Sequence, residues 1–438
     1  MKAKKIMALV LSAVLVVGLS ACSKSNSTSN SNANTSQSSK KKLTIWAWDG
    51  SFNIVAANEA KKIYQKDHPD VEVDVVEMAQ NDIVQKLNTN LSANSKEGLP
   101  NIVLIEDYRA QNYLTAYADS FKSISDKVKA QDFMDYKVKV CSSNGKLYGL
   151  PFDSGVTALF YRTDLIEQAG YKKEDMNNLT WDKFIEIGKA VKAKTGKSML
   201  TLDPSDLGLI RVMMQSAGSW YVKEDGKTIN IADNQALKES IKTWKNLMSA
   251  GIVKPITGWD NFVSAFQKGD VASVPTGCWI SSSVMKAQDQ SGKWAVTSIP
   301  KLGSVSSSVN ASNLGGSSWY VLDKVGDSDL AVDFLAKTFG SSTDLMNTLS
   351  DKINLVSTLK AASSTENYKK PNAFYGGQVV LQDFSNWSAK IPAVNYGSST
   401  YSIEDIMTGA VQNIVSKNAD LDSTLKDAQK QAEAAVGK

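Results

Sequence analysis

Acidic and aromatic side chains stand at the ends of several apolar runs that the sequence predicts to be β-strands. In an open α/β sheet, ligands bind outside the carboxyl ends of the strands, so these side chains are candidates for contacts with a small molecule. A carboxylate just after a strand also commonly caps a helix, and each acid has that second interpretation. The candidates at strand ends are Trp46, Trp48, Asp49, Glu106, Asp107, Tyr108, Asp153 and Asp203.

This set of side chains suits a ligand with apolar faces and hydroxyl edges. Aromatic rings bury the C–H faces of a sugar ring, and carboxylates accept hydrogen bonds from its hydroxyl groups. The chain has ten tryptophans, of which Trp181, Trp244 and Trp294 are expected in the core. Six others lie near turns, glycines or strand ends and are further candidates: Trp46, Trp48, Trp220, Trp279, Trp319 and Trp387.

The sequence offers little for catalysis or for a metal site. Its one histidine, His68, lies in a turn, and a single histidine cannot build the usual sites of transition metals. We find no phosphate-binding glycine loop, nucleophile elbow or dinucleotide fingerprint. A glycosidase would need two paired carboxylates, and the acids here are scattered. We predict no catalytic residue, no metal and no cofactor; a carbohydrate-active enzyme and a surface adhesin are the alternative classes.

The N-terminal residues predict export and a lipid anchor. Three lysines precede an apolar stretch at 6–19, which is shorter than the roughly 20 residues that a membrane span needs. The stretch ends in Leu19-Ser20-Ala21-Cys22, which resembles the lipobox of bacterial lipoproteins. That resemblance implies a signal peptide at 1–21 and acylation (palmitate) of Cys22 as the first mature residue.

A tether is expected to follow the lipidated cysteine, over residues 22–40. Its Ser, Asn and Thr residues cannot bury enough apolar surface to fold. As a flexible coil, the 17 residues at 23–39 would reach about 20–25 Å.

Charge and cysteine content exclude two further classes. Removing residues 1–21 takes away three of the 49 basic side chains, which leaves 46 against 45 acidic ones. A mature chain so nearly neutral has no broad basic field for nucleic acid. Beyond Cys22 only Cys141 and Cys278 remain, too few for a disulfide scaffold. We interpret both as free and buried or semi-buried, with a bridge between them as the alternative.

Strands and helices alternate along the first part of the mature chain. The apolar pattern predicts strands at 43–48, 71–75 and 102–105 and helices at 53–66 and 81–92. This order predicts an α/β domain with a layered, mainly parallel sheet. The middle continues in the same style, and an apolar stripe between 403 and 415 predicts a helix near the C-terminus.

Several segments together resemble the extracellular solute-binding proteins of ABC importers, in particular their sugar-binding group. The segments occur in the family's order and spread over nearly the whole mature chain. They are Lys146 to Asp153 with Leu159 to Leu165, Leu179 to Phe184, Phe262 to Val274 with Gly277-Cys278-Trp279, Leu314 to Ser318, and Leu425 to Ala428.

The resemblance implies a periplasmic-binding-protein-like fold with two α/β lobes, each a mainly parallel sheet flanked by helices. The ligand is then expected in the cleft between the lobes. Lobe 1 would hold 41–155 plus 308–355, and lobe 2 would hold 156–307 plus 356–438. The chain would cross between the lobes near 154–156, 304–310 and 351–358.

The resemblance also implies a function and a site. A monomeric, extracytoplasmic lipoprotein of the bacterial cell membrane would capture a mono- or oligosaccharide and deliver it to the permease subunits of an ABC importer with their cytoplasmic ATPase. Trp279 matches the family's Gly-x-Trp at the cleft, although Cys278 departs from the usual small residue or proline. Gly315 and Gly316 would either let the backbone approach the ligand or form a tight turn. The alternative ligand is a non-sugar solute.

The lipid anchor gives a first prediction. Wild-type protein should be found in the membrane fraction, because two or more acyl chains hold a protein stably at a bilayer. The Cys22→Ser variant should move to the soluble extracytoplasmic fraction, measured by fractionation and immunoblotting. A Cys22→Ser protein that is cleaved after Ala21 and remains fully membrane-bound would exclude the lipobox interpretation.

Overall fold

The computed structural model describes residues 41–436. One of its two main parts is built around a five-stranded sheet. The strand order is β2-β1-β3-β12-β6. Strand β1 runs parallel to both β2 and β3, whereas β12 runs antiparallel to both β3 and β6. The strands are β1 (Lys41–Ala47), β2 (Val71–Glu77), β3 (Ile102–Glu106), β6 (Gly149–Pro151) and β12 (Ser317–Val321).

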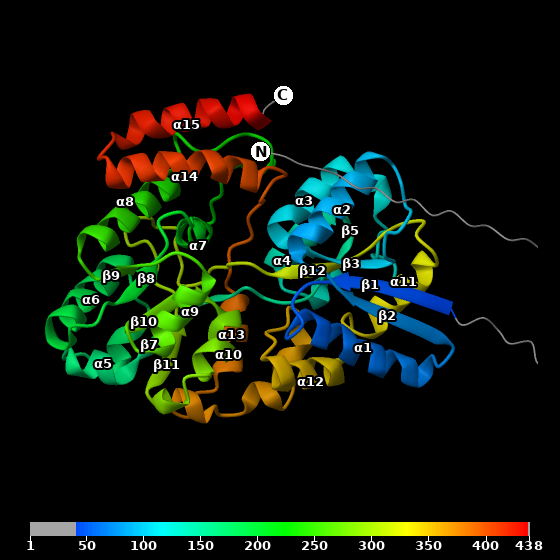
Figure 1. The fold of residues 1–438 in the computed structure, drawn as a ribbon, viewed down its shortest axis with the longest axis horizontal. Coiled ribbons are helices and arrows are strands. Elements are labelled where there is room, and N and C mark those ends of the chain that lie inside the picture. Colours follow the sequence, from blue (N-terminus) through cyan, green and yellow to red (C-terminus); the bar gives the residue numbers. More distant parts are fainter. Residues whose placement is uncertain (1–40, 437–438) are drawn as a thin grey trace, which may run out of the picture. The chain divides into compact units, whose positions relative to one another are not determined.

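Helices cover both faces of this sheet, because alternate side chains of the strands point to opposite faces. Val103 and Ile105 pack with α2 and α3, whereas Ile102 and Leu104 pack with α1, α11 and α12, and Figure 1 shows the two helix layers on either side. We call this sheet and its helices lobe 1. The helices are α1 (Asn53–Asp67), α2 (Gln80–Ser92), α3 (Asp107–Ala116), α4 (Asp135–Cys141), α11 (Ser328–Lys337) and α12 (Thr343–Ile353).

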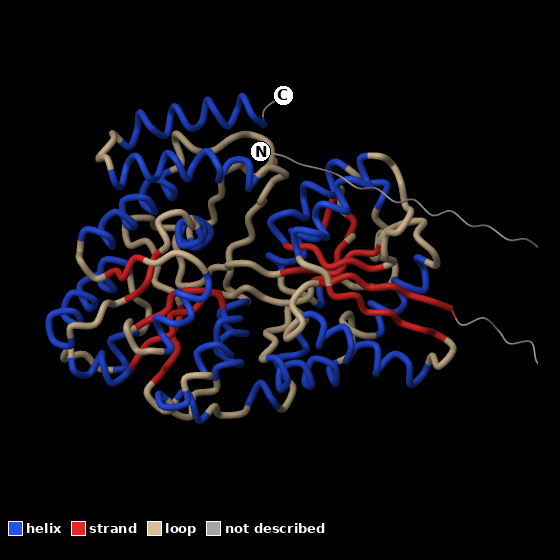
Figure 2. Tube along the Cα trace, in the orientation of Figure 1, coloured by secondary structure: helices blue, strands red, loops and turns tan. Residues whose placement is uncertain are grey.

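A second group of strands forms the centre of what we call lobe 2, and Figure 2 shows the two groups apart, each bordered by helices. The central strand β7 (Thr157–Arg162) pairs antiparallel with β10 (Ser273–Gly277) and with β11 (Trp294–Ser298). This differs from the mainly parallel sheet expected here. The apolar run of β7 reports that the strand is buried on both faces, and burial alone does not fix strand direction. A short parallel pair joins β8 (Leu200–Leu202) to β9 (Val253–Pro255).

The helices of lobe 2 begin and end where local chemistry directs. The Thr180 side chain accepts a hydrogen bond from the Lys183 amide at 3.3 Å and so caps α6, and Gly196, with φ +70°, ends the helix. Near the C-terminus the predicted apolar stripe is buried on α14. The helices are α5 (Thr163–Gln168), α6 (Trp181–Thr195), α7 (Gly208–Ser216), α8 (Gln235–Ser249), α9 (Trp259–Gln267), α10 (Ser281–Met285), α13 (Val380–Ser388), α14 (Thr400–Ser416) and α15 (Leu421–Val436).

Short elements complete the described chain. Strands β4 (Ser142–Ser143) and β5 (Lys146–Leu147) pair antiparallel with each other. The remaining helical turns are of the 3₁₀ type: η1 (Ala118–Ser120), η2 (Ala130–Asp132), η3 (Lys173–Met176), η4 (Cys278–Ile280), η5 (Gln288–Gln290), η6 (Lys360–Ser364), η7 (Asn367–Lys369) and η8 (Ala373–Tyr375).

Three chain segments connect the lobes side by side. Asp153 bridges to Ser357 and Val156 bridges to Asn313, so the stretches around 153–157, 312–314 and 356–358 form one hydrogen-bonded layer. The second segment lies later in the chain than expected. Residues 304–310 instead lie against lobe 2, where the Ser307 hydroxyl donates to the Ala217 carbonyl at 2.9 Å. The Ser and Gly content of 303–308 therefore marks a surface loop of lobe 2.

Both cysteines of the described chain are free and buried, as interpreted from their number. The Cys141 thiol donates to the Ser318 hydroxyl, and burial raises the pKa of Cys141 to about 12. Cys278 donates to the carbonyl of Ser154. Between residues 41 and 436, no helix combines the length and the apolar character needed to cross a membrane. The expected signal peptide, Cys22 and tether lie outside the described residues.

The tight packing of the crossing segments gives a second prediction. A Cβ on Gly155 would lie 2.4 Å from the Leu314 carbonyl oxygen, so Gly155→Ala should push two crossing segments apart. We expect a loss of about 1–3 kcal/mol in the free energy of unfolding, measured by urea denaturation. The control is Gly409→Ala in α14, where a Cβ meets nothing within 4 Å; better helix propensity should stabilise it by about 0.5–1 kcal/mol. A Gly155→Ala protein as stable as wild type would refute the packing described.

Candidate functional site

A cavity of about 450 Å³ lies where the two lobes face each other. Lobe 1 contributes Glu106 and Tyr108, which follow the carboxyl end of β3, and the crossing dipeptide Leu314-Gly315 forms part of the wall. Lobe 2 contributes the residues after β8, the start of α9 and the end of β10. The cavity size lies in the usual range for small-molecule sites, and its position at strand ends is the one expected for open α/β sheets.

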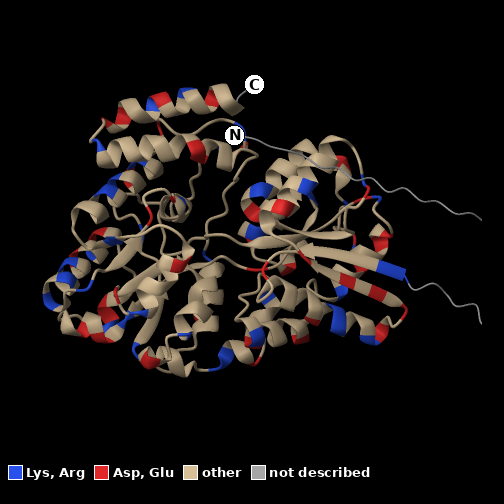
Figure 3. Ribbon diagram, viewed as in Figure 1, with Lys and Arg blue, Asp and Glu red and all other residues tan. Residues whose placement is uncertain are grey.

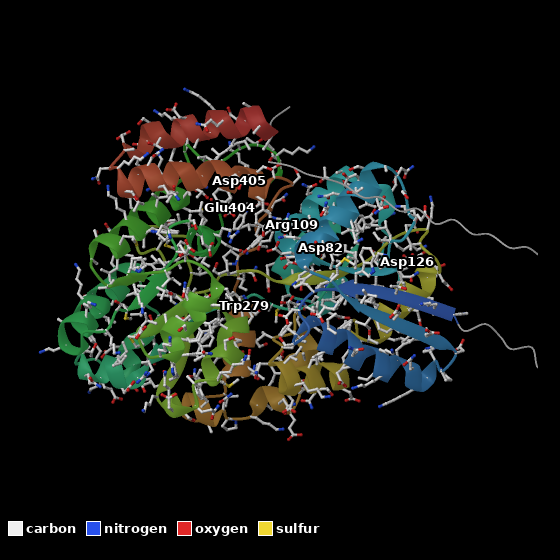
Figure 4. All side chains as sticks on the ribbon, in the orientation of Figure 1. Asp82, Arg109, Asp126, Trp279, Glu404 and Asp405 are labelled. Carbon is white, nitrogen blue, oxygen red and sulfur yellow. The ribbon has the colours of Figure 1, made fainter. Side chains whose placement is uncertain are left out.

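Trp279 forms an aromatic wall of the cavity on the lobe 2 side, and Figure 4 labels it. Its indole Nε1 donates a hydrogen bond to the Leu314 carbonyl at 3.0 Å, which fixes the ring plane. A Cβ at position 277 would lie 2.1 Å from that nitrogen, so only glycine fits there. The Gly-x-Trp spacing therefore has a steric cause in this chain.

Tyr108 forms the facing wall from lobe 1. Its hydroxyl accepts a hydrogen bond from the Gly315 amide at 3.2 Å. The ring stacks on Trp220, with centroids 5.5 Å apart and planes at 23°, and the Arg211 guanidinium lies 4.9 Å from the ring centroid. Burial raises the pKa of Tyr108 well above its usual value, so the hydroxyl is protonated at neutral pH.

Three carboxylates, Glu106, Asp203 and Asp206, line the same cavity. Asp203 accepts hydrogen bonds from the Ser205 amide and hydroxyl at 2.9 and 2.6 Å and from the Gly258 amide at 3.4 Å. Burial opposes its ionisation, but these hydrogen bonds prevail and hold the pKa of Asp203 below its usual value. Asp203 therefore presents an ionised acceptor to a ligand that donates hydrogen bonds.

Two charged groups of the cavity are held by partners from the C-terminal part of the chain. The Tyr401 hydroxyl donates to both Glu106 carboxylate oxygens, at 2.8 and 2.7 Å. Arg211 Nη1 donates to Glu404 Oε2 at 2.8 Å, and the two opposite charges form a buried ion pair. Figure 4 labels Glu404 on α14. Arg211 therefore lines the cavity while its charge is balanced by Glu404.

Asp107 and Asp153, both predicted site residues, lie beneath the cavity in a buried ionic cluster instead of lining it. Lys137 Nζ donates to Asp107 Oδ2 at 2.5 Å and to the Asp153 carbonyl at 2.8 Å. Asp153 Oδ1 accepts from the amide and hydroxyl of Ser317 at 2.6 and 2.8 Å. Burial raises the pKa of Asp107 to about 6, although the Lys137 charge acts in the opposite direction. The cluster joins α4 to two crossing segments.

Gly316, another predicted site residue, fits against this ionic cluster. Its φ is +98°, and a Cβ would lie 2.7 Å from Asp107 Oδ2. Its neighbour Gly315 lines the cavity, with φ +82°. Gly315 therefore lies at the cavity, whereas Gly316 is required by its positive φ and by its close approach to Asp107.

Of the twelve predicted ligand-binding residues, the structure brings Tyr108, Asp203 and Trp279 together around the cavity. Trp319 is fully buried between Phe152 and Phe339, and Trp220 is buried behind Tyr108 with its indole nitrogen donating to Thr400. Near-complete burial places these two tryptophans in the core, because a strand end or a nearby glycine does not by itself expose a ring.

The other predicted residues also lie outside the cavity lining. Trp46 is buried under α2 and α3, Trp48 is half-buried against the core, and Trp387 packs beside Phe384. Asp49 is exposed and closes its own turn, accepting from the Ser51 amide at 3.0 Å. A ligand contact from Trp46, Trp48, Asp49 or Trp387 stays a prediction.

The sequence analysis missed several lining residues. Trp259 is 54 % exposed and lies 5.8 Å from Trp279, centroid to centroid. Asp206 comes from the loop after β8, and Arg211 comes from α7. The Gly258-Trp259 pair at the start of α9 was the available signal for Trp259. Among residues 41–436, no group of three or more metal-ligating side chains is placed to hold an ion.

Comparisons with known proteins agree with this geometry. The family model described as bacterial extracellular solute-binding protein matches residues 59–375. The lactose-binding protein of Rhizobium radiobacter is 46 % identical over 390 residues, which are 89 % of this chain and 92 % of that protein. The arabinooligosaccharide-binding protein of Bacillus subtilis (strain 168) is 27 % identical over 308 residues, 68 % and 69 % of the two chains. The GacH receptor of Streptomyces glaucescens shares the fold, with a TM-score of 0.75, 17 % identity, and coverage of 91 % and 99 %.

The ionic cluster beneath the cavity gives a third prediction. Lys137→Met leaves two carboxylates buried without their counter-charge, so we expect a loss of about 3–5 kcal/mol in the free energy of unfolding. Urea denaturation at neutral pH measures the loss. Lys62→Met is the matched control, because Lys62 pairs with Glu59 at 2.8 Å on the surface, and its effect should be much smaller. Equal effects of the two substitutions would contradict the structural role given to Lys137.

Proposed function

This chain belongs to the family of bacterial extracellular solute-binding proteins, and on that premise we propose that it captures a disaccharide or short oligosaccharide for an ABC importer. The family acts outside the cytoplasm, and so does this chain. The observation that carries the proposal is the pairing, in one interlobe cavity, of a fixed tryptophan face with carboxylate acceptors. Trp279 supplies the face, and Asp203 is the acceptor whose ionisation is held by hydrogen bonds.

A sugar matches both parts of this cavity. The C–H face of a pyranose ring covers the indole, and the hydroxyl groups at its edge donate to the carboxylates. Anionic solutes such as phosphate would be repelled by the carboxylates that line the cavity, because the lining arginine, Arg211, is already paired with Glu404. These carboxylates belong to Glu106, Asp203 and Asp206. Because the relative that is 46 % identical over 92 % of its length is a lactose-binding protein, lactose is the first ligand to test.

The same features favour binding over catalysis. A retaining or inverting glycosidase needs one carboxyl group that is protonated at the working pH. The Asp203 carboxyl has a lowered pKa and is therefore a poor proton donor. We propose that the bound sugar leaves the protein unchanged.

The partners follow from this role. We propose that acylated Cys22 anchors the chain to the bilayer and that a monomer docks on the permease subunits, which work with a cytoplasmic ATPase. In the view of Figure 3, Lys and Arg are interspersed with Asp and Glu along the helices of both lobes.

The proposed function gives a fourth prediction. Titration calorimetry of the mature domain with lactose should show one site per chain, and chromatography after long incubation should recover lactose intact. Trp279→Ala should weaken binding by about 1–3 kcal/mol, because the stacking face is lost. Trp279→Phe, which keeps a ring but no indole N–H, should lose less.

Thermal melting of each variant serves as the folding control. Unchanged affinity in a folded Trp279→Ala protein would remove Trp279 from the site. Release of galactose and glucose would favour an enzyme, and absence of binding by any neutral saccharide of a broad panel would overturn the carbohydrate proposal.

A further inference from the structure

We propose that the cleft has a second, outer subsite formed by Trp259, so that a trisaccharide is bound more tightly than the disaccharide it contains. The inference rests on the proposed function and adds the length of ligand that the site accepts. It starts from one anomaly of the surface. Trp259 is 54 % exposed, whereas the largest aromatic side chains of the described residues are mostly buried. An exposed indole at the mouth of a cavity is a ready platform for a sugar ring.

Trp259 contacts both other members of an aromatic strip made of Phe262, Trp259 and Trp279, and it is the exposed member of the three. The Trp259 centroid lies 5.5 Å from that of Phe262 and 5.8 Å from that of Trp279, with the planes tilted by 47° and 41°. All three side chains line the cavity. Trp279 is partly buried and is fixed by its bond to Leu314, whereas Trp259 faces solvent. The strip therefore extends the apolar face of the inner site toward the surface, with a change of direction between the two indoles.

Trp259 also lines a second hollow, which has a volume of about 270 Å³. It lies between α9 and α10, and its walls carry polar groups from Asp260, Ser264, Lys268 and Lys286. These side chains offer both donors and acceptors, as the hydroxyl groups of a sugar require. Trp259 lines both hollows, and in this proposal a ligand that fills the cavity continues past this ring into the outer hollow.

The backbone fixes where this indole stands. Gly258, which precedes it, has φ +81° and ψ 155°, a conformation that essentially only glycine adopts. The Gly258 amide donates to Asp203 Oδ2 at 3.4 Å, so an acceptor of the inner site also holds the start of α9. Trp259 is the first residue of α9, and about half of its surface is open to solvent. The local geometry thus holds the ring at the mouth of the cavity.

The occupant that fits is a third sugar unit of the same ligand. The outer hollow is polar, apart from Trp259 and Val263, and it adjoins the cavity that already receives the ligand. A protein partner would instead need a broad apolar patch. Among the described residues the other exposed large apolar side chain is Val309, in a loop of lobe 2 that lines neither hollow.

The test compares ligand lengths by titration calorimetry. Lactose is the disaccharide, and the 3′-, 4′- and 6′-galactosyllactoses are trisaccharides that carry one further hexose. Wild-type protein should bind at least one galactosyllactose about five- to tenfold more tightly than lactose, the gain expected from one more stacked ring. Trp259→Ala should remove that gain, so that the ratio of the trisaccharide affinity to the lactose affinity falls to about one. Trp259→Phe should keep part of the gain, and Val309→Ala is the control for loss of an exposed apolar side chain.

Each result decides the proposal. Loss of trisaccharide preference in Trp259→Ala alone supports the outer subsite, and melting curves equal to wild type show that the variant is folded. An equal loss for lactose and for the trisaccharides would place Trp259 in the inner site and overturn the inference. Lactose binding without any gain for a trisaccharide would overturn it too, while leaving the proposed function intact. If neither lactose nor a galactosyllactose binds, the outer subsite as stated here is overturned, whereas the proposed function fails only if no neutral saccharide of the broad panel binds.

Discussion

The binding cavity depends on the backbone of one crossing dipeptide, Leu314-Gly315. The Leu314 carbonyl accepts from the Trp279 indole of lobe 2, and the Gly315 amide donates to the Tyr108 hydroxyl of lobe 1. Two aromatic walls from different lobes are thus hydrogen-bonded to the same peptide group, the one that joins Leu314 to Gly315 in the connection between the lobes. A rotation of that connection is therefore expected to move both walls, so that the shape of the cavity changes together with the angle between the lobes.

Buried polar networks keep this connection in place. Lys137 joins Asp107 to the first crossing segment, and Asp153 holds the amide that follows the second. A buried charge without a partner is costly, so such a network has one favoured arrangement. The ion pair between Arg211 and Glu404 joins α7 to α14. The charge of Arg211 is therefore balanced within the protein, and Asp203 keeps its own hydrogen-bond donors.

The sequence was most informative where periodicity or a steric requirement left a trace. The strand predicted at 71–75 and the helix predicted at 81–92 correspond to β2 and α2, and Trp279 of the Gly-x-Trp segment, expected at the cleft, lines the cavity. It was least informative about burial of single side chains. Asp107 resembles any strand-end acid until α4 brings Lys137 beside it, and the burial of Trp319 arises from β12 pairing with β3 over a separation of more than two hundred residues. Strand direction in lobe 2 likewise depends on long-range pairing that an apolar run does not encode.

A ligand that contacts both Trp279 of lobe 2 and Tyr108 of lobe 1 is expected to close the lobes around itself. Periplasmic binding proteins generally close in this way, because a ligand that contacts both lobes favours the state in which both contacts are made. Small-angle X-ray scattering of the mature domain, with and without a saturating sugar whose binding calorimetry has confirmed, tests this claim most directly. The account predicts a smaller radius of gyration in the saturated protein. An unchanged radius of gyration at full occupancy would contradict it and would favour a rigid binding site.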